Sequence, residues 1–179
     1  MKNYIFIIYV SPLLYLCAKL FIIKNVNDPI KYIYTITGVS ATLILLLLLI
    51  IPLIKDKINL MKYRKSVGII GFIYALLHFL NFIFLDSQFD IEFIIKEVFD
   101  KSFIYLGIIS FFILLFMLLT SIKKLYKKYN KYHKLIYFSI LLITIHWVMA
   151  QKSLTLEHFF YLLIIFLIFY YKLKNLRFR

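Results

Sequence analysis

The stretch FIYALLHFLNFIFLD, Phe72 to Asp86, decides the fold class. With the apolar residues before it, it forms an uncharged segment over 67–85, and a helix of about 20 such residues is long enough to cross the hydrocarbon core of a membrane. His78 nevertheless stands in the middle of this segment. A polar side chain at that depth is costly unless it faces protein, water or a cofactor. The stretch therefore predicts a membrane-spanning helix that carries a functional histidine.

The composition of the whole chain agrees with a membrane protein. Hydrophobic residues make up 64% of the 179 residues and charged residues only 17%, whereas about a quarter of the residues of a soluble domain are charged. The mean hydropathy is +0.91. The 22 Lys and Arg outnumber the 8 Asp and Glu, and in a membrane protein this excess indicates topology rather than a nucleic-acid partner. Cys17 is the single cysteine, which excludes a disulfide or thiolate metal site.

Six segments are apolar enough to cross the bilayer as helices. They cover approximately residues 4–23, 36–54, 67–85, 103–122, 134–151 and 158–172. The connections are short, so neighbouring segments are expected to be antiparallel neighbours in one bundle. The first segment lacks a small-residue cleavage site and is expected to be a retained span. The predicted fold is an all-α polytopic membrane helical bundle of about six transmembrane helices, forming a single domain over 1–179.

The distribution of charge predicts the orientation of this bundle. Sixteen of the 22 basic residues fall at position 2, in the second and fourth connections, and in the C-terminal tail, while seven of the eight acidic residues fall in the other connections. Because cytoplasmic loops are rich in Lys and Arg, both termini are predicted to be cytoplasmic and the third and fifth spans to run outward.

The acidic third connection, DSQFDIEFIIKEVFD at residues 86–100, mixes apolar residues with acids. This pattern suggests a short amphipathic segment at the outer surface. A solvated loop face and a docking surface for an external partner are the alternatives.

Two histidines are expected at similar depth. His78 lies 13 residues beyond Lys65, and His146 lies 12 residues beyond Lys134 on a span that runs the same way. At 1.5 Å per residue, each is roughly 20 Å along its helix. Two imidazoles at matched depth on two helices of a bundle can clamp a flat cofactor by its central iron. Histidines that bond between helices are the alternative.

The other two histidines lie near the interfaces. His133 precedes His146 by 13 residues, which places the two side chains roughly 140° apart around an ideal helix. His133 is therefore either a ligand of a second centre, after a local adjustment of the helix, or an ordinary interfacial histidine. His158, at the outer start of the last span, is expected to be interfacial.

A b-type haem suits the deep pair better than zinc does. A catalytic zinc site wants three protein ligands and an open position, whereas an apolar porphyrin fits between helices and takes two histidines. The chain has no CxxCH motif, so attachment would be non-covalent. Bis-histidine iron has no open position for substrate, and the function expected of it is electron transfer.

The segment from about Lys62 to Lys152 resembles the MsrQ family of haem-binding membrane subunits, relatives of ferric reductase transmembrane domains. The resemblance is carried by YRKSVGIIGFIYALLHFLNFIFLD, KSFIYLG, LLTSIKKLYKKYNKYHKLIYF and IHWVMAQK, in this order. Matching positions are Arg64, Lys65, Gly68, Phe72, Tyr74, Ala75, Leu77, His78, Asp86, Gly107, Thr120, Ser121, His133, Leu135, Tyr137, His146 and Lys152. Lys101, Ser102, Phe103, Tyr129, Tyr132 and Lys134 depart from the family pattern.

The resemblance implies a division of labour between two proteins. A membrane subunit of the bacterial inner membrane passes electrons from the quinone pool or a flavin reductase, through one or two haem b groups, to a periplasmic molybdopterin enzyme that repairs methionine sulfoxide in oxidised proteins. It also implies that His78, His146 and His133 ligate haem iron and that FMN is an associated cofactor. The chain would then be an electron-transfer subunit and not the catalytic one.

Three other functions stay open from the sequence. A stand-alone transmembrane ferric or quinone reductase would use the same haem without a partner protein. A small transporter would use the histidines as proton relays, but such proteins carry ionisable residues on several spans and broken helices. A non-redox membrane anchor would use them only to bond between helices.

Overall fold

The computed structural model describes residues 2–23, 26–151 and 153–177, so Lys152, which carries part of the family resemblance, lies outside the described residues. In that part of the chain, eight α-helices form and there is no strand. The helices are α1 (Lys2–Cys17), α2 (Pro29–Ile50), α3 (Arg64–Asn81), α4 (Ile91–Asp100), α5 (Ser102–Leu119), α6 (Lys123–Tyr129), α7 (Leu135–Ala150) and α8 (Leu156–Arg177). Two π-helical turns, Ala18–Ile23 and Phe82–Asp86, extend α1 and α3, and two 3₁₀ turns, Met61–Tyr63 and Asn130–Lys134, precede α3 and α7.

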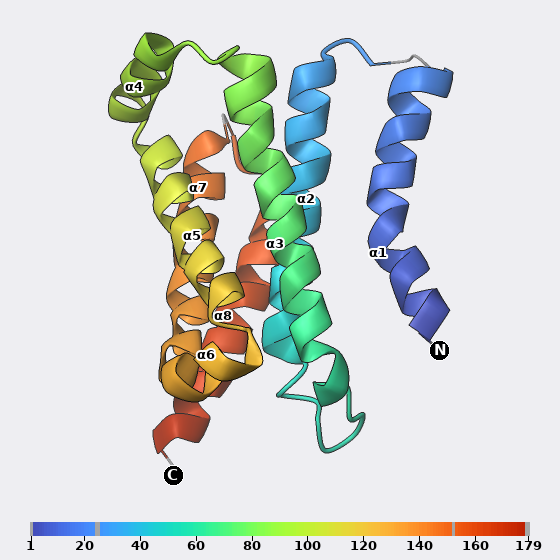
Figure 1. The fold of residues 1–179 in the computed structure, drawn as a ribbon, viewed down its shortest axis with the longest axis vertical. Coiled ribbons are helices and arrows are strands. Elements are labelled where there is room, and N and C mark those ends of the chain that lie inside the picture. Colours follow the sequence, from blue (N-terminus) through green and yellow to red (C-terminus); the bar gives the residue numbers. More distant parts are fainter. Residues whose placement is uncertain (1, 24–25, 152, 178–179) are drawn as a thin grey trace.

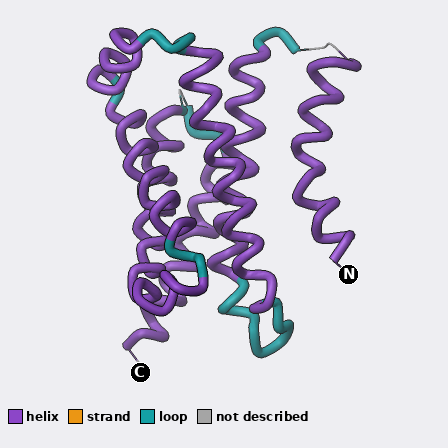
Figure 2. Tube along the Cα trace, in the orientation of Figure 1, coloured by secondary structure: helices purple, strands orange, loops and turns teal. Residues whose placement is uncertain are grey.

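The helices α1, α2, α3, α5, α7 and α8 run along the long axis of the molecule (Figure 1). The short helices α4 and α6 lie at opposite ends, and both chain ends lie toward the end that holds α6. Figure 2 shows that the loops between them are short. The prediction of an all-α polytopic membrane protein is confirmed.

Four helical segments of the described chain are long and apolar enough to cross a membrane: Pro29–Ile50, Met61–Asp86, Ser102–Leu119 and Lys123–Ala150. Two shorter apolar helices, Tyr9–Ile23 and His158–Lys172, correspond to the first and last predicted spans. The exact number of spans therefore stays a prediction.

The predicted start of the second span at residue 36 is wrong. Helix α2 begins at Pro29, because the Asp28 carboxylate caps it by accepting a hydrogen bond from the Lys31 backbone N–H at 3.0 Å. An Asp at the N-cap followed by Pro is a standard helix start, since Pro has no backbone N–H to leave unpaired there. Hydropathy alone missed this start, because residues 28–35 are mixed in polarity.

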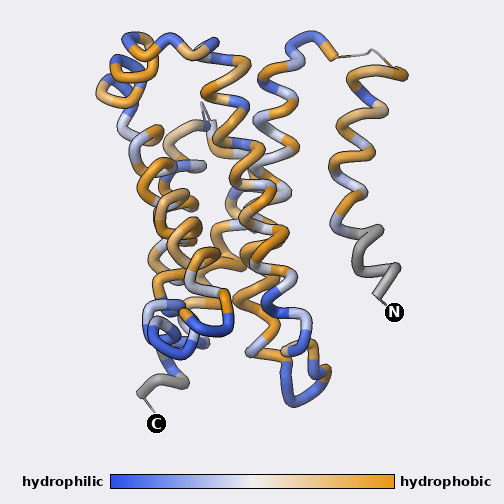
Figure 3. The backbone as a smooth tube through the Cα atoms, in the orientation of Figure 1, coloured by the Kyte–Doolittle hydropathy of each residue, from blue (hydrophilic) through white to orange (hydrophobic). Residues whose placement is uncertain are grey.

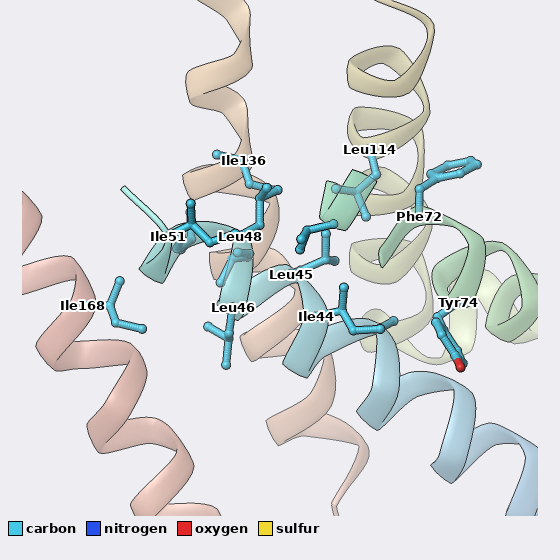
Figure 4. Packing of buried hydrophobic residues seen from close by; sticks show 14 of the residues in the cluster. Ile44, Leu45, Leu46, Leu48, Ile51, Phe72, Tyr74, Leu114, Ile136 and Ile168 are labelled. Carbon is cyan, nitrogen blue, oxygen red and sulfur yellow. The ribbon is translucent and has the colours of Figure 1, made fainter. Parts of the chain in front are cut away.

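The apolar core is centred on α2. Leu45 and Leu49 are only 1% exposed, and Figure 4 shows the leucines of this helix facing Phe72, Leu114, Ile136 and Ile168. Gly71 brings α3 close, since a Cβ there would lie 2.9 Å from Leu45 Cδ2. Small residues permit such close packing between membrane helices. The closest backbone packing is between α2 and α3, and between α5 and α7.

The surface changes character along the long axis. Apolar residues dominate the middle of the bundle, while hydrophilic residues gather at α6 and in the connection between α2 and α3 (Figure 3). At the opposite end, the predicted amphipathic segment is the helix α4, which the Asp90 carboxylate caps through the Phe93 N–H at 3.0 Å. Its exposed Ile91, Ile95 and Phe99 lie one turn apart on one face.

Candidate functional site

The two deep histidines meet between the two closest helix pairs. His78 belongs to α3, which packs on α2, and His146 belongs to α7, which packs on α5. Their imidazole centroids are 6.2 Å apart and the ring planes are perpendicular. The structure thus brings together the two histidines for which matched depth was predicted.

Main-chain and hydroxyl oxygens fix the orientation of the His78 ring. Its Nδ1 lies 3.2 Å from the Tyr34 carbonyl oxygen and 3.4 Å from Thr37 Oγ1. The Thr37 hydroxyl lies 2.6 Å from the Ile33 carbonyl, to which it donates. A carbonyl oxygen only accepts, so the proton of this contact is on Nδ1 of His78.

The His146 ring is held in the same way by a different helix. Its Nδ1 donates to the Phe103 carbonyl oxygen at 2.6 Å. When Nδ1 of a neutral imidazole carries the proton, Nε2 keeps a free lone pair, and a hydrogen bond from Nδ1–H to a carbonyl is the usual support of a metal-binding histidine. Both deep imidazoles can therefore offer Nε2 to a metal.

Two glycines leave the space that these rings occupy. A Cβ at Gly38 would lie 3.0 Å from His78 Nδ1 and Cε1, and a Cβ at Gly107 would lie 2.9 Å from His146 Nδ1. Real Cβ atoms are rarely this close to another heavy atom. Sequence reasoning used Gly107 only through the family resemblance and missed Gly38, Tyr34 and Thr37. The available signal was that the chain has four glycines, all inside predicted spans.

His133 lies apart from this arrangement, at the end of the bundle that carries α6. It belongs to the 3₁₀ turn Asn130–Lys134 and not to α7, so the ideal-helix angle of 140° from His146 does not apply. Its Nε2 is 3.2 Å from Thr120 Oγ1, and its ring centroid is 5.0 Å from that of Tyr126.

A cavity of about 420 Å³ opens beside His133. Its polar lining includes Arg64, Lys65 and Lys123, and its apolar lining includes Phe72 and residues of α2, α5 and α7. The cavity thus combines an apolar interior with basic side chains at one end of the bundle.

His158 takes part in the start of α8. Its Nδ1 accepts a hydrogen bond from the Thr155 backbone N–H at 2.9 Å, and its ring centroid lies 4.8 Å from that of Trp147. Both contacts suit the interfacial residue that was predicted.

Comparison with known proteins identifies the family. The model of the ferric reductase-like transmembrane component family matches residues 51–144, which is more than half of the chain and includes His78 and His133. No solved structure matches the chain.

Curated relatives occur in Brucella. Proteins of Brucella ovis and Brucella canis are 34% identical over 144 residues, and one of Brucella melitensis biotype 2 is 33% identical over the same length. Each is named "Protein-methionine-sulfoxide reductase heme-binding subunit MsrQ", and each match covers 77% of this chain and 66% of the relative. The chain therefore spans slightly less than two thirds of the length of these relatives. The chain belongs to the family of ferric reductase-like transmembrane components, and it is similar to the Brucella MsrQ proteins named above.

Proposed function

We propose that this protein is the haem b electron-transfer subunit of a methionine sulfoxide reductase system. The observation that carries the proposal is the pair formed by His78 and His146. Their ring centroids lie 6.2 Å apart, and each Nδ1 is hydrogen-bonded to a backbone carbonyl. The names of the Brucella relatives, which describe a heme-binding subunit, support the same function.

The spacing of the two rings fits one iron between them. An imidazole–metal bond is about 2 Å and the ring centre lies about 1 Å behind the nitrogen, so two ligands of one metal have ring centroids about 6 Å apart. The centroids of His78 and His146 are 6.2 Å apart. The glycines at 38 and 107 let the rings lie back against neighbouring helices.

The residues of the chain would then bind the haem and keep substrates away from its iron. Haem supplies reversible one-electron chemistry at its iron when bound. His78 and His146 would both be ligands of the haem iron, which would leave no position there for a substrate. Thr37, Tyr34 and Phe103 keep the imidazole protons on Nδ1, away from the metal. Such a site passes electrons on and transforms no substrate itself.

We also propose His133 as a ligand of a second haem. The cavity beside it has apolar walls, and Arg64 and Lys65 are basic partners for the haem carboxylates. Changing His133 to Ala is expected to reduce haem content per chain while leaving the signal of the His78–His146 pair unchanged. Quantitative haem analysis of the purified variant tests this, and an unchanged haem content would contradict the proposal.

The proposed donor and acceptor of electrons are those that the resemblance to MsrQ proteins implies, and the predicted orientation assigns each of them a side of the membrane. Electrons enter at the inner side, from the quinone pool or a flavin reductase, with FMN as an associated cofactor. They leave toward a periplasmic molybdopterin methionine sulfoxide reductase. The protein would then be a multi-pass protein of the bacterial inner membrane and the non-catalytic subunit of an oxidoreductase complex.

Haem reoxidation in liposomes tests this function. The purified protein is reduced, and the partner molybdenum enzyme is added with methionine sulfoxide while the reduced haem band is followed. We expect reoxidation only when both the partner and its substrate are present. His158→Ala is the matched control, because this histidine supports the start of α8 and not the pair, and it is expected to behave as the unchanged protein.

Two results would contradict the proposal in different ways. Reduced haem that persists with the partner and methionine sulfoxide, but reacts rapidly with ferric chelates, would favour a stand-alone ferric reductase. A protein without haem, made with haem available during expression, would favour an anchor or a transporter.

A further inference from the structure

The two imidazoles of the pair are held by two short segments of the same design. Residues 34–38 of α2 read YTITG, and residues 103–107 of α5 read FIYLG. Each segment begins with an aromatic residue and ends, four residues later, with a glycine. We call them the holder segments. The three residues between the aromatic residue and the glycine differ at every position.

In each holder segment, the aromatic residue makes two contacts with one imidazole. The Tyr34 carbonyl accepts from His78 Nδ1 at 3.2 Å, and the Tyr34 ring centroid lies 5.2 Å from the His78 ring. The Phe103 carbonyl accepts from His146 Nδ1 at 2.6 Å, and the Phe103 ring centroid lies 5.8 Å from the His146 ring. The main-chain carbonyl thus keeps the proton on Nδ1, and the aromatic ring limits rotation of the imidazole.

The glycine one turn later has no side chain, and this leaves room for the imidazole. A Cβ at position 38 or 107 would come within about 3 Å of the ring that the carbonyl holds. The ring is rigid and bonded to a carbonyl, so it cannot move aside as the end of a long aliphatic side chain can. An alanine would therefore move the imidazole or break its hydrogen bond.

Each holder segment also acts within one helix pair. Segment 34–38 of α2 holds the histidine of α3, and segment 103–107 of α5 holds the histidine of α7; these are the pairs with the closest backbone packing. Each ring is therefore oriented within its own pair, and the position of the two rings relative to each other depends on how the pairs meet.

We propose that the aromatic residue and the glycine of each holder segment are positioning residues, which orient Nε2 of His78 and His146 toward a shared ligand. This inference rests on the proposed haem-binding function, since the shared ligand is the haem iron. It assigns a role to four residues, Tyr34, Gly38, Phe103 and Gly107, that do not themselves touch the metal.

Glycine-to-alanine variants at positions 38 and 107 test the role, with Thr35→Ala as control. Thr35 lies in the first holder segment, but its side chain is exposed and its hydroxyl donates to the Lys31 carbonyl. The readouts are the low-spin signal of oxidised haem in electron paramagnetic resonance and the binding of carbon monoxide to reduced haem, which six-coordinate iron resists.

We expect Gly38→Ala and Gly107→Ala each to lose the low-spin signal of the unchanged protein and to gain carbon monoxide binding. Thr35→Ala should do neither. If either glycine variant does not fold, Tyr34→Leu and Phe103→Leu keep the main-chain carbonyl and remove the ring, in Tyr34→Leu together with the hydroxyl that bonds to Asp86, and each should shift or broaden the low-spin signal. Folded variants of Tyr34, Gly38, Phe103 or Gly107 that keep the original signal and exclude carbon monoxide would overturn the proposal.

A measurement on the haem-free protein separates this inference from the proposed function. Nitrogen-15 spectra of labelled histidine report which ring nitrogen carries the proton. We expect His78 and His146 to be protonated at Nδ1 without haem, and Gly107→Ala to lose this preference at His146 alone. A wild-type protein that binds no haem but shows these tautomers would refute the haem function and keep the holder role, whereas mixed tautomers in a haem-binding protein would refute the holder role.

Discussion

An imidazole inside a membrane needs a partner for its N–H group, and here the backbone provides that partner. Helical carbonyls of Tyr34 and Phe103 accept from the two rings although they lie inside helices. A backbone acceptor carries no charge, so it holds the ring without adding an ionised group at bilayer depth. Using carbonyls in place of carboxylates is consistent with predicted spans whose deep ionisable groups are almost only histidines.

The tyrosine hydroxyl at position 34 has a separate role from its carbonyl. It donates to Asp86 Oδ2 at 3.0 Å, at the exposed end of α3. Tyr34→Phe removes this bond and keeps the carbonyl and the ring, so we expect an unchanged haem spectrum and a loss of stability below about 1 kcal/mol. Thermal unfolding in detergent measures the loss, and Asp86→Ala, which removes the acceptor, should give a similar one. Loss of haem in Tyr34→Phe would show that the hydroxyl is part of the site.

At the scale of single residues, the sequence predicts histidines better than glycines. His78 and His146 stand out because a polar side chain in an apolar run has a known cost. Gly38 has no side chain and almost no effect on hydropathy, so its importance becomes visible only when another helix places a ring beside it.

Among the helices, a buried hydroxyl pair joins α5 to α7. Ser110 Oγ and Ser139 Oγ are 2.8 Å apart, and both side chains are at most 1% exposed. Hydrogen bonds between membrane helices contribute about 0.6 kcal/mol on average. This bond lies on the helix pair that carries His146, so it helps to keep Phe103 and His146 in contact.

Replacing Ser110 or Ser139 by Ala is expected to lower the free energy of unfolding by about 0.5–1 kcal/mol, because each change removes one side of a buried bond. The double variant should cost little more than either single one. Reversible unfolding in mixed micelles, analysed as a double-mutant cycle, gives the coupling. Fully additive effects would show that the two hydroxyls do not stabilise each other. Ser121→Ala is a control, since its hydroxyl bonds only within its own helical region, to Met117.

Helix boundaries were less predictable than the all-helical fold. The start of α2 depends on the Asp28 cap and on Pro29, which a hydropathy window averages away. The turn that holds His133 is 3₁₀, with His133 and Tyr132 carbonyls both close to the Leu135 N–H. Hydropathy cannot distinguish such a turn from the first turn of α7, because both are composed of the same kinds of residues.

For the whole molecule, charge and shape agree on two distinct ends. The basic α6 and the α2–α3 connection lie at one end, and α4 with its acidic residues lies at the other (Figure 1). The positive-inside rule then predicts that α6 lies on the cytoplasmic side. Which helices pack together could not be read from the sequence, since hydropathy identifies a span without identifying its neighbours.

Accessibility of introduced cysteines tests the orientation. In a Cys17→Ser background, Asp56→Cys lies in the α2–α3 connection and Glu92→Cys lies on α4; both positions are exposed. A membrane-impermeant thiol reagent applied to intact spheroplasts should label Glu92→Cys at once and Asp56→Cys only after permeabilisation. The opposite pattern would invert the topology and the proposed direction of electron flow.

The most direct test of the central claim is the electron paramagnetic resonance spectrum of the purified, oxidised protein, recorded beside His78→Ala and His146→Ala. If the two imidazoles share one iron, the unchanged protein shows a low-spin bis-imidazole signal, and each single substitution abolishes it. A bis-imidazole signal that survives either substitution would contradict the claim, because one of the two ligands would then lie elsewhere in the chain.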